Sequence, residues 1–220
     1  MKSIAILLAG SALAIGANAA TVSFNFSNPL QTTEINQSGN LGLFNSSLGT
    51  LTGVSLSFNG ANTTTLSLTN NAQQTQSTRA TSTTDLFFSS TLGALNGIIV
   101  AANPVISLSA TTGVVSLNAG QTQSFGPLTD SDSVTWSSQV AGILSSFVGA
   151  GNFAIGCTSL SGIAIQGGGG NIASTQATQA GCGAAIEYTY TVRPTQVPEP
   201  GALALVGIAL AGLALARRKA

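Results

Sequence analysis

The residues of this chain that could do chemistry are carboxylates, because the 220-residue sequence contains no histidine. Without histidine, the chain cannot form a Ser-His-Asp or Cys-His nucleophile, a histidine-ligated zinc site or the general base that most enzymes use near neutral pH. Glycosidases instead use two carboxylates about 5 to 9 Å apart. An enzyme built on this sequence would therefore need two acids to meet in one groove. The acids available between residues 20 and 196 are Glu34, Asp85, Asp130, Asp132 and Glu187.

Asp130 and Asp132, in the stretch LTDSDSV, are the two acids nearest in sequence. In a strand, their spacing of two residues would direct both side chains to one face, where they could serve glycan hydrolysis or bind calcium. Calcium takes about six to eight oxygen ligands, however, and the spacing and glycine of an EF-hand loop are absent. The aromatic residues that could stack on a sugar, Trp136, Tyr188 and Tyr190, fall on apolar faces. The sequence therefore favours a polar turn whose Asp and Ser side chains bind backbone groups, and predicts no catalytic residue, no metal and no cofactor.

Charged residues make up only 5% of the chain, compared with about 25% in an average soluble domain. Between residues 20 and 196 there are two arginines, Arg79 and Arg193, against the five acids, so this segment has a net charge of −3 and no lysine. Nucleic-acid binding needs clustered lysine and arginine, so we exclude it. The stretches NTTTLSLTN and STRATSTTD have no regular repeat and are expected to form the solvent face of a sheet.

The N-terminus has the three parts of an export signal. Lys2 supplies a positive charge, residues 4–15 form an apolar core, and the small residues Ala17 and Ala19 fit a cleavage site. The apolar core is shorter than the roughly 20 residues that a membrane span needs. We therefore expect residues 1–19 to be a signal peptide that signal peptidase cleaves after Ala19.

Two cysteines, Cys157 and Cys182, both lie in the segment that would be exported. An even number of cysteines in an oxidising compartment favours a disulfide, and two free buried thiols are the alternative. Closing a loop of this length would stabilise the fold by about 3.5 kcal/mol on a chain-entropy estimate.

Residues 20–192 alternate apolar and polar side chains with the period of two that is typical of half-buried strands. The runs are TVSFNFSN, GVSLSFNG, TTLSLTN, NPVISLSA, GVVSLNAG, SVTWSS and IEYTYTV. Turn-forming pairs lie between them, and they predict strands of about five to seven residues. These pairs are Asn59-Gly60, Asn70-Asn71, Thr112-Gly113 and Ala119-Gly120. The fold class is therefore all-β, an antiparallel β-sandwich of jelly-roll or immunoglobulin-like type.

Two segments of this region depart from the strand pattern. In SSQVAGILSSFVG, Val140, Ile143, Leu144 and Phe147 recur at helical spacing and predict one short helix, with Ser137 or Ser138 as its cap. The Gly-rich stretch at residues 166–181 predicts a flexible loop whose flanks the disulfide would join. Its four consecutive glycines lack the Lys-Ser/Thr of a phosphate-binding loop.

The end of the chain combines a proline-rich linker with an apolar segment. Three prolines in residues 193–200 exclude a helix and a central strand. Residues 201–220 follow with an apolar run that would reach about 24 Å as a helix, compared with a bilayer core of about 30 Å. A basic end, Arg217, Arg218 and Lys219, closes the chain and would lie on the inner side of the membrane.

The order Pro198-Glu199-Pro200, apolar helix and Arg217-Arg218-Lys219 resembles the PEP-CTERM sorting signal of Gram-negative bacteria. The resemblance implies that an exosortase, a membrane-embedded cysteine protease, cleaves the tail near residues 198–200. It further implies that the ectodomain is held transiently at the inner membrane and then passes to the cell surface or the extracellular matrix. Such proteins typically occur in species that make extracellular polysaccharide. A plain C-terminal membrane anchor is the alternative.

The ectodomain carries a second resemblance. SLGTLTGVSLSFNG, FVGAGNF and IEYTYTV are similar to segments of the choice-of-anchor E domains, which are exported β-rich modules. This resemblance implies a surface β-module and assigns no catalytic residue.

From these features we expect a non-enzymatic structural or adhesive protein associated with extracellular polysaccharide. Two alternatives stay open. A carboxylate-dependent glycan-active enzyme would need two acids in one groove, and an aggregating biofilm-matrix protein would need exposed strand edges that can pair.

Overall fold

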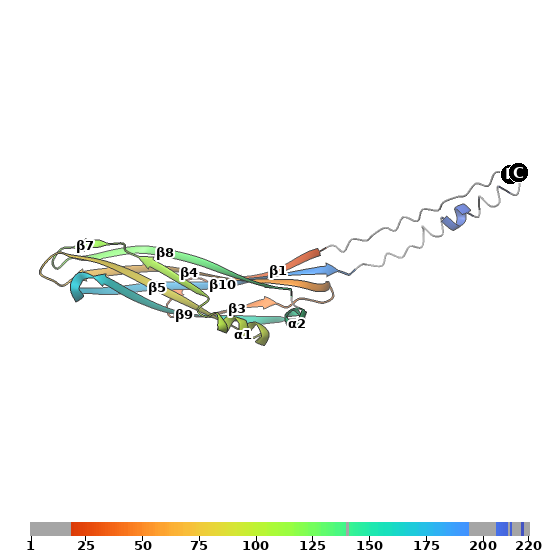
Figure 1. Ribbon diagram of the computed structural model, residues 1–220, viewed down its shortest axis with the longest axis horizontal. Helices are drawn as coiled ribbons and strands as arrows, with labels where there is room; N and C mark the ends of the chain where they lie inside the picture. Colours follow the sequence, from red (N-terminus) through yellow and green to blue (C-terminus); the bar gives the residue numbers. More distant parts are fainter. Residues whose placement is uncertain (1–18, 140, 194–205, 211, 213–216, 218–220) are drawn as a thin grey trace. The chain divides into compact units, whose positions relative to one another are not determined.

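The computed structural model describes residues 19–139, 141–193, 206–210, 212 and 217. Within these residues the chain is mainly antiparallel β-structure (Figure 1). The strands belong to one compact unit, Asn18–Val192. They are β1 (Ala19–Ser27), β2 (Gln31–Thr32), β3 (Asn36–Gly42), β4 (Gly49–Asn70), β5 (Gln76–Ser90), β6 (Ile106–Thr111), β7 (Val115–Leu117), β8 (Thr122–Ser138), β9 (Asn152–Gly167) and β10 (Ile172–Val192).

The strands form two sheets that pack face to face, so the expected antiparallel sandwich is confirmed. Sheet A has the order β1-β10-β4-β8, and the short strand β2 also pairs with β10. Sheet B has the order β3-β9-β5-β6, and β7 pairs with β5. Antiparallel pairing places the start of β1 beside the end of β10, and β7 lies at the opposite end of the sandwich (Figure 1).

Six of the strands, β1, β4, β5, β8, β9 and β10, are longer than the sequence predicted. GVSLSFNG and TTLSLTN are parts of one 22-residue strand, β4, and the expected turn at Asn59-Gly60 lies in its middle. This prediction was wrong because Gly60 faces sheet B, where a Cβ atom would collide with the Leu86 side chain. The glycine thus serves the close approach of the two sheets. The predicted turns at Thr112-Gly113 and Ala119-Gly120 do lie in connections between strands, and the pair Asn70-Asn71 marks the end of β4.

The period of two correctly identified the buried face of most strands. Val54, Leu56 and Phe58 are buried on β4, as are Ile106 and Leu108 on β6. An exception is Val134 on β8, which is 39% exposed because β8 lies at the edge of sheet A.

Buried apolar residues form two separate clusters. The larger cluster lies toward the ends of β1 and β10 and contains Phe44, Phe88, Phe147 and Tyr188, and the smaller consists of Leu66, Leu68, Ala80 and Leu117. Between them the facing sheets bury polar side chains. Asn62 Nδ2 donates to Thr84 Oγ1 at 3.1 Å, and the Thr64 and Thr178 hydroxyls lie 2.9 Å apart.

The disulfide Cys157–Cys182 is present and links β9 of sheet B to β10 of sheet A, with 6.6 Å between the two Cα atoms. The expected flexible loop at residues 166–181 was wrong. Its first two residues end β9, a 3-10 turn, η2 (Gly168–Gly170), follows, and Ile172–Gly181 then pairs with β4. The glycine content misled the prediction, because Gly181 is needed in the strand where the backbone of Asn28 and Pro29 approaches closely.

The segment expected to be helical forms α2 (Ala141–Leu144) and a 3-10 turn, η1 (Ser145–Phe147), which bury Leu144 and Phe147. Ser137 and Ser138 are the last two residues of β8, which ends shortly before this segment, and their role as a cap stays a prediction. A second helix, α1 (Gly93–Ala101), was not predicted. It buries Leu95 and Ile99, and its two internal glycines hid the helical spacing.

Candidate functional site

The two segments expected to direct processing connect to neighbouring strand ends. Ala19, the last residue of the predicted signal peptide, is the first residue of β1 and pairs with Thr191 of β10. The chain therefore enters and leaves the sandwich at one end (Figure 1). Ala17 lies outside the described residues.

Most of the expected sorting tail also lies outside the described residues, including Pro198, Glu199, Pro200, Arg218 and Lys219. Residues 206–210 are helical, and Val206, Ile208 and Leu210 are at least 55% exposed there. Arg217 is also exposed. In the part of the chain that the structure describes, no helix has the length and apolar character needed to cross a membrane.

Asp130 and Asp132 lie within β8 rather than in the predicted turn. The turn prediction was wrong because the β4–β8 ladder runs through both positions, pairing Asp130 with Asn62 and Asp132 with Gly60. Their carboxylates accept hydrogen bonds from backbone N–H groups. Asp130 Oδ2 accepts from Ser109 N at 2.8 Å, and Asp132 Oδ1 accepts from Ser133 N at 2.7 Å.

The other acids are spread over the sandwich. Glu34 accepts from Ser159 Oγ at 2.8 Å and from Ser161 N at 2.7 Å, while Asp85 accepts from Ser107 Oγ at 2.6 Å. Glu187 lies on the solvent face of sheet A. Asp130 and Asp132 lie two residues apart on β8, while Asp85 and Asp130 bind Ser107 and Ser109 of the same strand, β6. Across the described ranges, no group of three or more His, Cys, Asp or Glu side chains could hold a metal ion.

The aromatic side chains named in the sequence are part of the core. Tyr188 is fully buried and its hydroxyl donates to Gly42 O at 2.8 Å. Burial raises the pKa of this phenol, so it stays protonated. Trp136 and Tyr190 are half-buried, and their rings lie against Phe147 and Phe44. These contacts leave Tyr188 unable to stack on a ligand at the surface.

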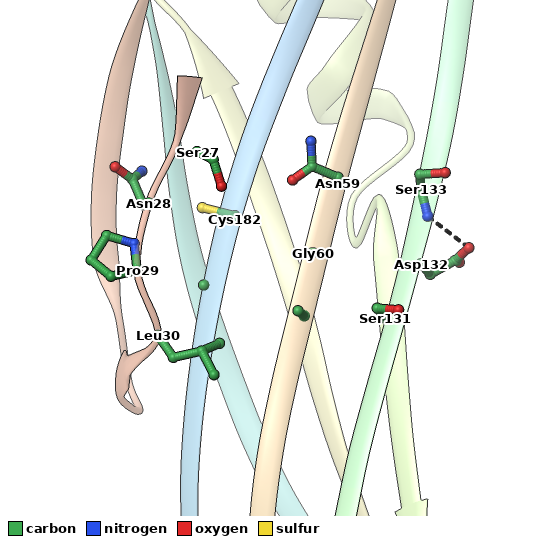
Figure 2. A pocket seen from close by; sticks show the side chains of 12 residues that line it. Ser27, Asn28, Pro29, Leu30, Asn59, Gly60, Ser131, Asp132, Ser133 and Cys182 are labelled. Carbon is green, nitrogen blue, oxygen red and sulfur yellow. Dashed lines mark hydrogen bonds between the residues drawn. The ribbon is translucent and has the colours of Figure 1, made fainter. Parts of the chain in front are cut away.

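A trough of about 640 Å³ crosses the solvent face of sheet A, a volume in the range of small-molecule sites. In Figure 2 the segment Asn28–Leu30 stands on one side, Asn59 and Gly60 lie at the centre, and Ser131–Ser133 stand on the other side. The residues that line the trough are Ser27, Asn28, Pro29, Leu30, Asn59, Gly60, Ala61, Ser131, Asp132, Ser133, Gly181 and Cys182.

A glycine of the lining allows two walls of the trough to approach. A Cβ atom at Gly181 would lie 3.0 Å from Asn28 O and 3.1 Å from Pro29 O, so glycine at this position lets the segment after β1 lie close to β10. Leu30 is 42% exposed and adds an apolar surface. The sequence reasoning missed the trough because it assigned the glycines after Gln166 to a loop.

The trough offers neutral hydrogen-bonding groups. Asn59 supplies an amide, Ser131 and Ser133 supply hydroxyls, and Asp132 is the one ionisable residue of the lining. Two smaller hollows, of about 400 and 280 Å³, lie on the same strands. Along β4 the three hollows include Val54, Gly60 and Thr63 in turn, so they form a row parallel to the strands.

Comparison with known proteins identifies the end of the chain. The family model described as the PEP-CTERM protein-sorting motif matches residues 196–219. No curated protein matches the chain.

Among solved structures, the coat protein of Tobacco streak virus is 12% identical, with a TM-score of 0.20, and the match covers 87% of this chain and 99% of that one. A structure of infectious bursal disease virus, Gt strain, is 13% identical, with a TM-score of 0.17, and the match covers 94% of this chain and 52% of that one. Likenesses this low carry no conclusion about function.

Proposed function

We propose that this PEP-CTERM protein is a non-enzymatic component of an extracellular polysaccharide matrix, and that its trough binds an uncharged glycan. The motif at residues 196–219 marks the chain as a sorted, exported protein and as a substrate of an exosortase. It also implies a C-terminal signal that anchors the chain in a membrane before processing. The role in the matrix is the new part of the proposal. The observation that supports it most directly is the sorting motif.

The position of the two ends supports presentation of the sandwich from one end. Ala19 and Thr191 pair across β1 and β10, so both processing sites connect to the same end of the sandwich. Cleavage at either site leaves the strand ladder from Ala20 to Val192 uncut. The trough lies on the middle of sheet A, at Asn59 and Gly60 of β4.

The chemistry of the trough favours a neutral sugar over an acidic one. Amide and hydroxyl groups can exchange hydrogen bonds with sugar hydroxyls, while Pro29 and Leu30 can contact the C–H face of a ring. Asp132 at the β8 edge of the trough and the net charge of −3 over residues 20–196 would repel uronate, sulfate or phosphate groups. The row of hollows extends over about ten residues of β4, or about 33 Å, which suits a linear polymer lying along the strands.

The environment of the acids supports a non-enzymatic role over a carboxylate-dependent enzyme. Retaining and inverting glycosidases need two carboxyl groups that face one bound sugar. Here Asp130 and Glu34 each accept a backbone N–H from an edge of sheet B, and Asp85 accepts a serine hydroxyl. Asp132 is the one acid that lines the trough.

Binding of neutral hexasaccharides of gluco, manno and galacto configuration to the full-length protein in detergent tests the trough. We expect the double variant Asn59→Ala/Ser133→Ala to weaken binding about tenfold, because it removes two hydrogen-bonding groups of about 0.5–1.5 kcal/mol each. The matched control is Ser67→Ala/Ser124→Ala, a cross-strand pair on the same face of β4 and β8 outside the trough. Equal loss in both variants, or binding of an oligouronate of the same length in place of the neutral sugars, would overturn the trough assignment.

A further inference from the structure

Two edges of sheet B are closed by carboxylates that come from outside that sheet. On one side Asp130 of β8 accepts from Ser109 N of β6 at 2.8 Å. On the other side Glu34 accepts from Ser161 N of β9 at 2.7 Å. Each contact occupies a backbone donor that would otherwise be available to another strand, and each places a negative charge at the edge. Inward-pointing charges and occupied donors are ways in which native sheets avoid edge-to-edge pairing.

A third stretch of edge lacks such a closure. In the described part of the chain, β3 pairs with β9 only as far as Thr158, and β2 pairs with β10 only from Gln179. Beyond these points β9 and β10 continue to the η2 turn without a neighbour on this side. We call the stretches Ile163–Gly167 and Ile172–Ala177 the open side.

The backbone of the open side presents hydrogen-bonding groups outward. Thr178 O accepts from Thr33 N on this side of β10, and the backbone groups of a strand alternate between its two sides. Ser174 and Gln176 therefore direct their N–H and C=O groups away from β4. The same reasoning from Ser161 N directs the backbone groups of Ile163 outward from β9.

The side chains of the open side are apolar or neutral. Ile163 faces the interior and is nevertheless 36% exposed, while Ile165 and Ile172 are half-buried against the smaller core cluster. No acid or base occurs in either stretch, and the nearby Arg79 donates to Gln166 Oε1. Glu34 accepts a hydrogen bond from Ser161 N, just before the open side begins. Its carboxylate therefore occupies the edge of β9 only as far as Ser161.

We propose that the open side is a self-association surface, at which β10 of one copy pairs antiparallel with β10 of a second copy. An antiparallel twofold pair brings each edge residue opposite the same stretch of its partner, and no charge in Ile172–Ala177 opposes this pairing. The pairing continues sheet A across two copies and covers Ile163. Because the paired stretch has only six residues, the dimer forms reversibly and depends on concentration. Glu34 and Asp130 confine the pairing to this side.

Sedimentation velocity of the full-length protein in density-matched detergent tests this surface. We expect the wild type to dimerise at micromolar concentrations and Ser174→Pro to be monomeric, because proline removes an outward N–H and is tolerated at a sheet edge. The control is Thr175→Ala, whose backbone groups face β4, and which is expected to dimerise like the wild type.

A second variant covers the case in which Ser174→Pro fails to fold. Ile163→Lys places a charge at the open side without changing the β10 backbone, and it is expected to weaken dimerisation at least about tenfold. A monomeric wild type, or dimerisation unchanged in a folded Ser174→Pro or Ile163→Lys variant, would overturn the proposal.

Discussion

The two halves of the sandwich are stabilised in different ways. We call the half that contains the start of β1 and the end of β10 the base half. It contains the larger apolar cluster, with Phe44, Phe88, Phe147 and Tyr188, and the disulfide links its two sheets. The half at η2 and β7, here the tip half, contains only Leu66, Leu68, Ala80 and Leu117 as its buried cluster. Buried aromatic area dominates core energetics, so the base half supplies most of the stability. The open side, Ile163–Gly167 and Ile172–Ala177, lies in the tip half, which contributes the smaller share of the stability.

Tyr188 is the position where the base half should be most sensitive. Tyr188→Ala is expected to lower the free energy of unfolding by about 4 kcal/mol, since it removes a fully buried ring and leaves a cavity. Urea denaturation of the exported protein measures this. Tyr188→Phe is the control and should cost about 1 kcal/mol through loss of the hydrogen bond to Gly42 O. A cost below that of Tyr188→Phe in the alanine variant would contradict the assignment of stability to the base half.

The disulfide should give the next largest effect. The double variant Cys157→Ala/Cys182→Ala is expected to lose about 3.5 kcal/mol, because the unfolded chain regains the entropy of a closed loop. Thiol labelling of the exported wild type under denaturing, non-reducing conditions should leave both cysteines unmodified. Ready labelling of the wild type would show that the link between the sheets does not form.

Leu68→Ala tests the tip half, where a cost of about 2 kcal/mol is expected, at the low end for a buried leucine. Amide hydrogen exchange should show faster opening of residues 66–69 and of the paired residues 173–176, with the base half unchanged. Faster exchange spread evenly over β4 would mean that the two halves open together.

The polar layer between the halves should give the smallest effect. Ser82 Oγ is buried and has no hydrogen-bond partner within the described residues. Ser82→Ala is therefore expected to be neutral or to stabilise the protein by up to about 1 kcal/mol. A thermal melt of the variant decides this, and a clear loss of stability would show that the hydroxyl has a role in the folded state.

The sequence patterns were most informative where a local rule decides the structure. The period of two identified Leu56 and Ile186 as buried, and the cysteine count anticipated the link between the sheets. Strand length was not predictable, because the glycine at position 60 can mark a turn or a close approach of two sheets, and only the position of Leu86 decides between them. The same ambiguity hid strand β10 in a Gly-rich stretch.

The trough and the contacts of Asp130 and Glu34 with the edges of sheet B could not be predicted from the sequence either, because both depend on how the strands pair and pack. The residues of the trough come from β1 and the segment after it, and from β4, β8 and β10, so they meet only through the sheet register. Asp130 was correctly recognised as a ligand of backbone groups. Its partner, Ser109, belongs to the other sheet, and no spacing in the sequence indicates that contact.

Sorting by the tail is the central claim, and the intact mass of the protein in each cell fraction tests it most directly. The wild type is compared with the variant Pro198→Ala/Glu199→Ala/Pro200→Ala. We expect the wild type to leave the membrane and to lack everything after residues 198–200, while the variant keeps its full tail in the membrane fraction. A wild-type protein that keeps its tail through to Ala220 would contradict processing by an exosortase.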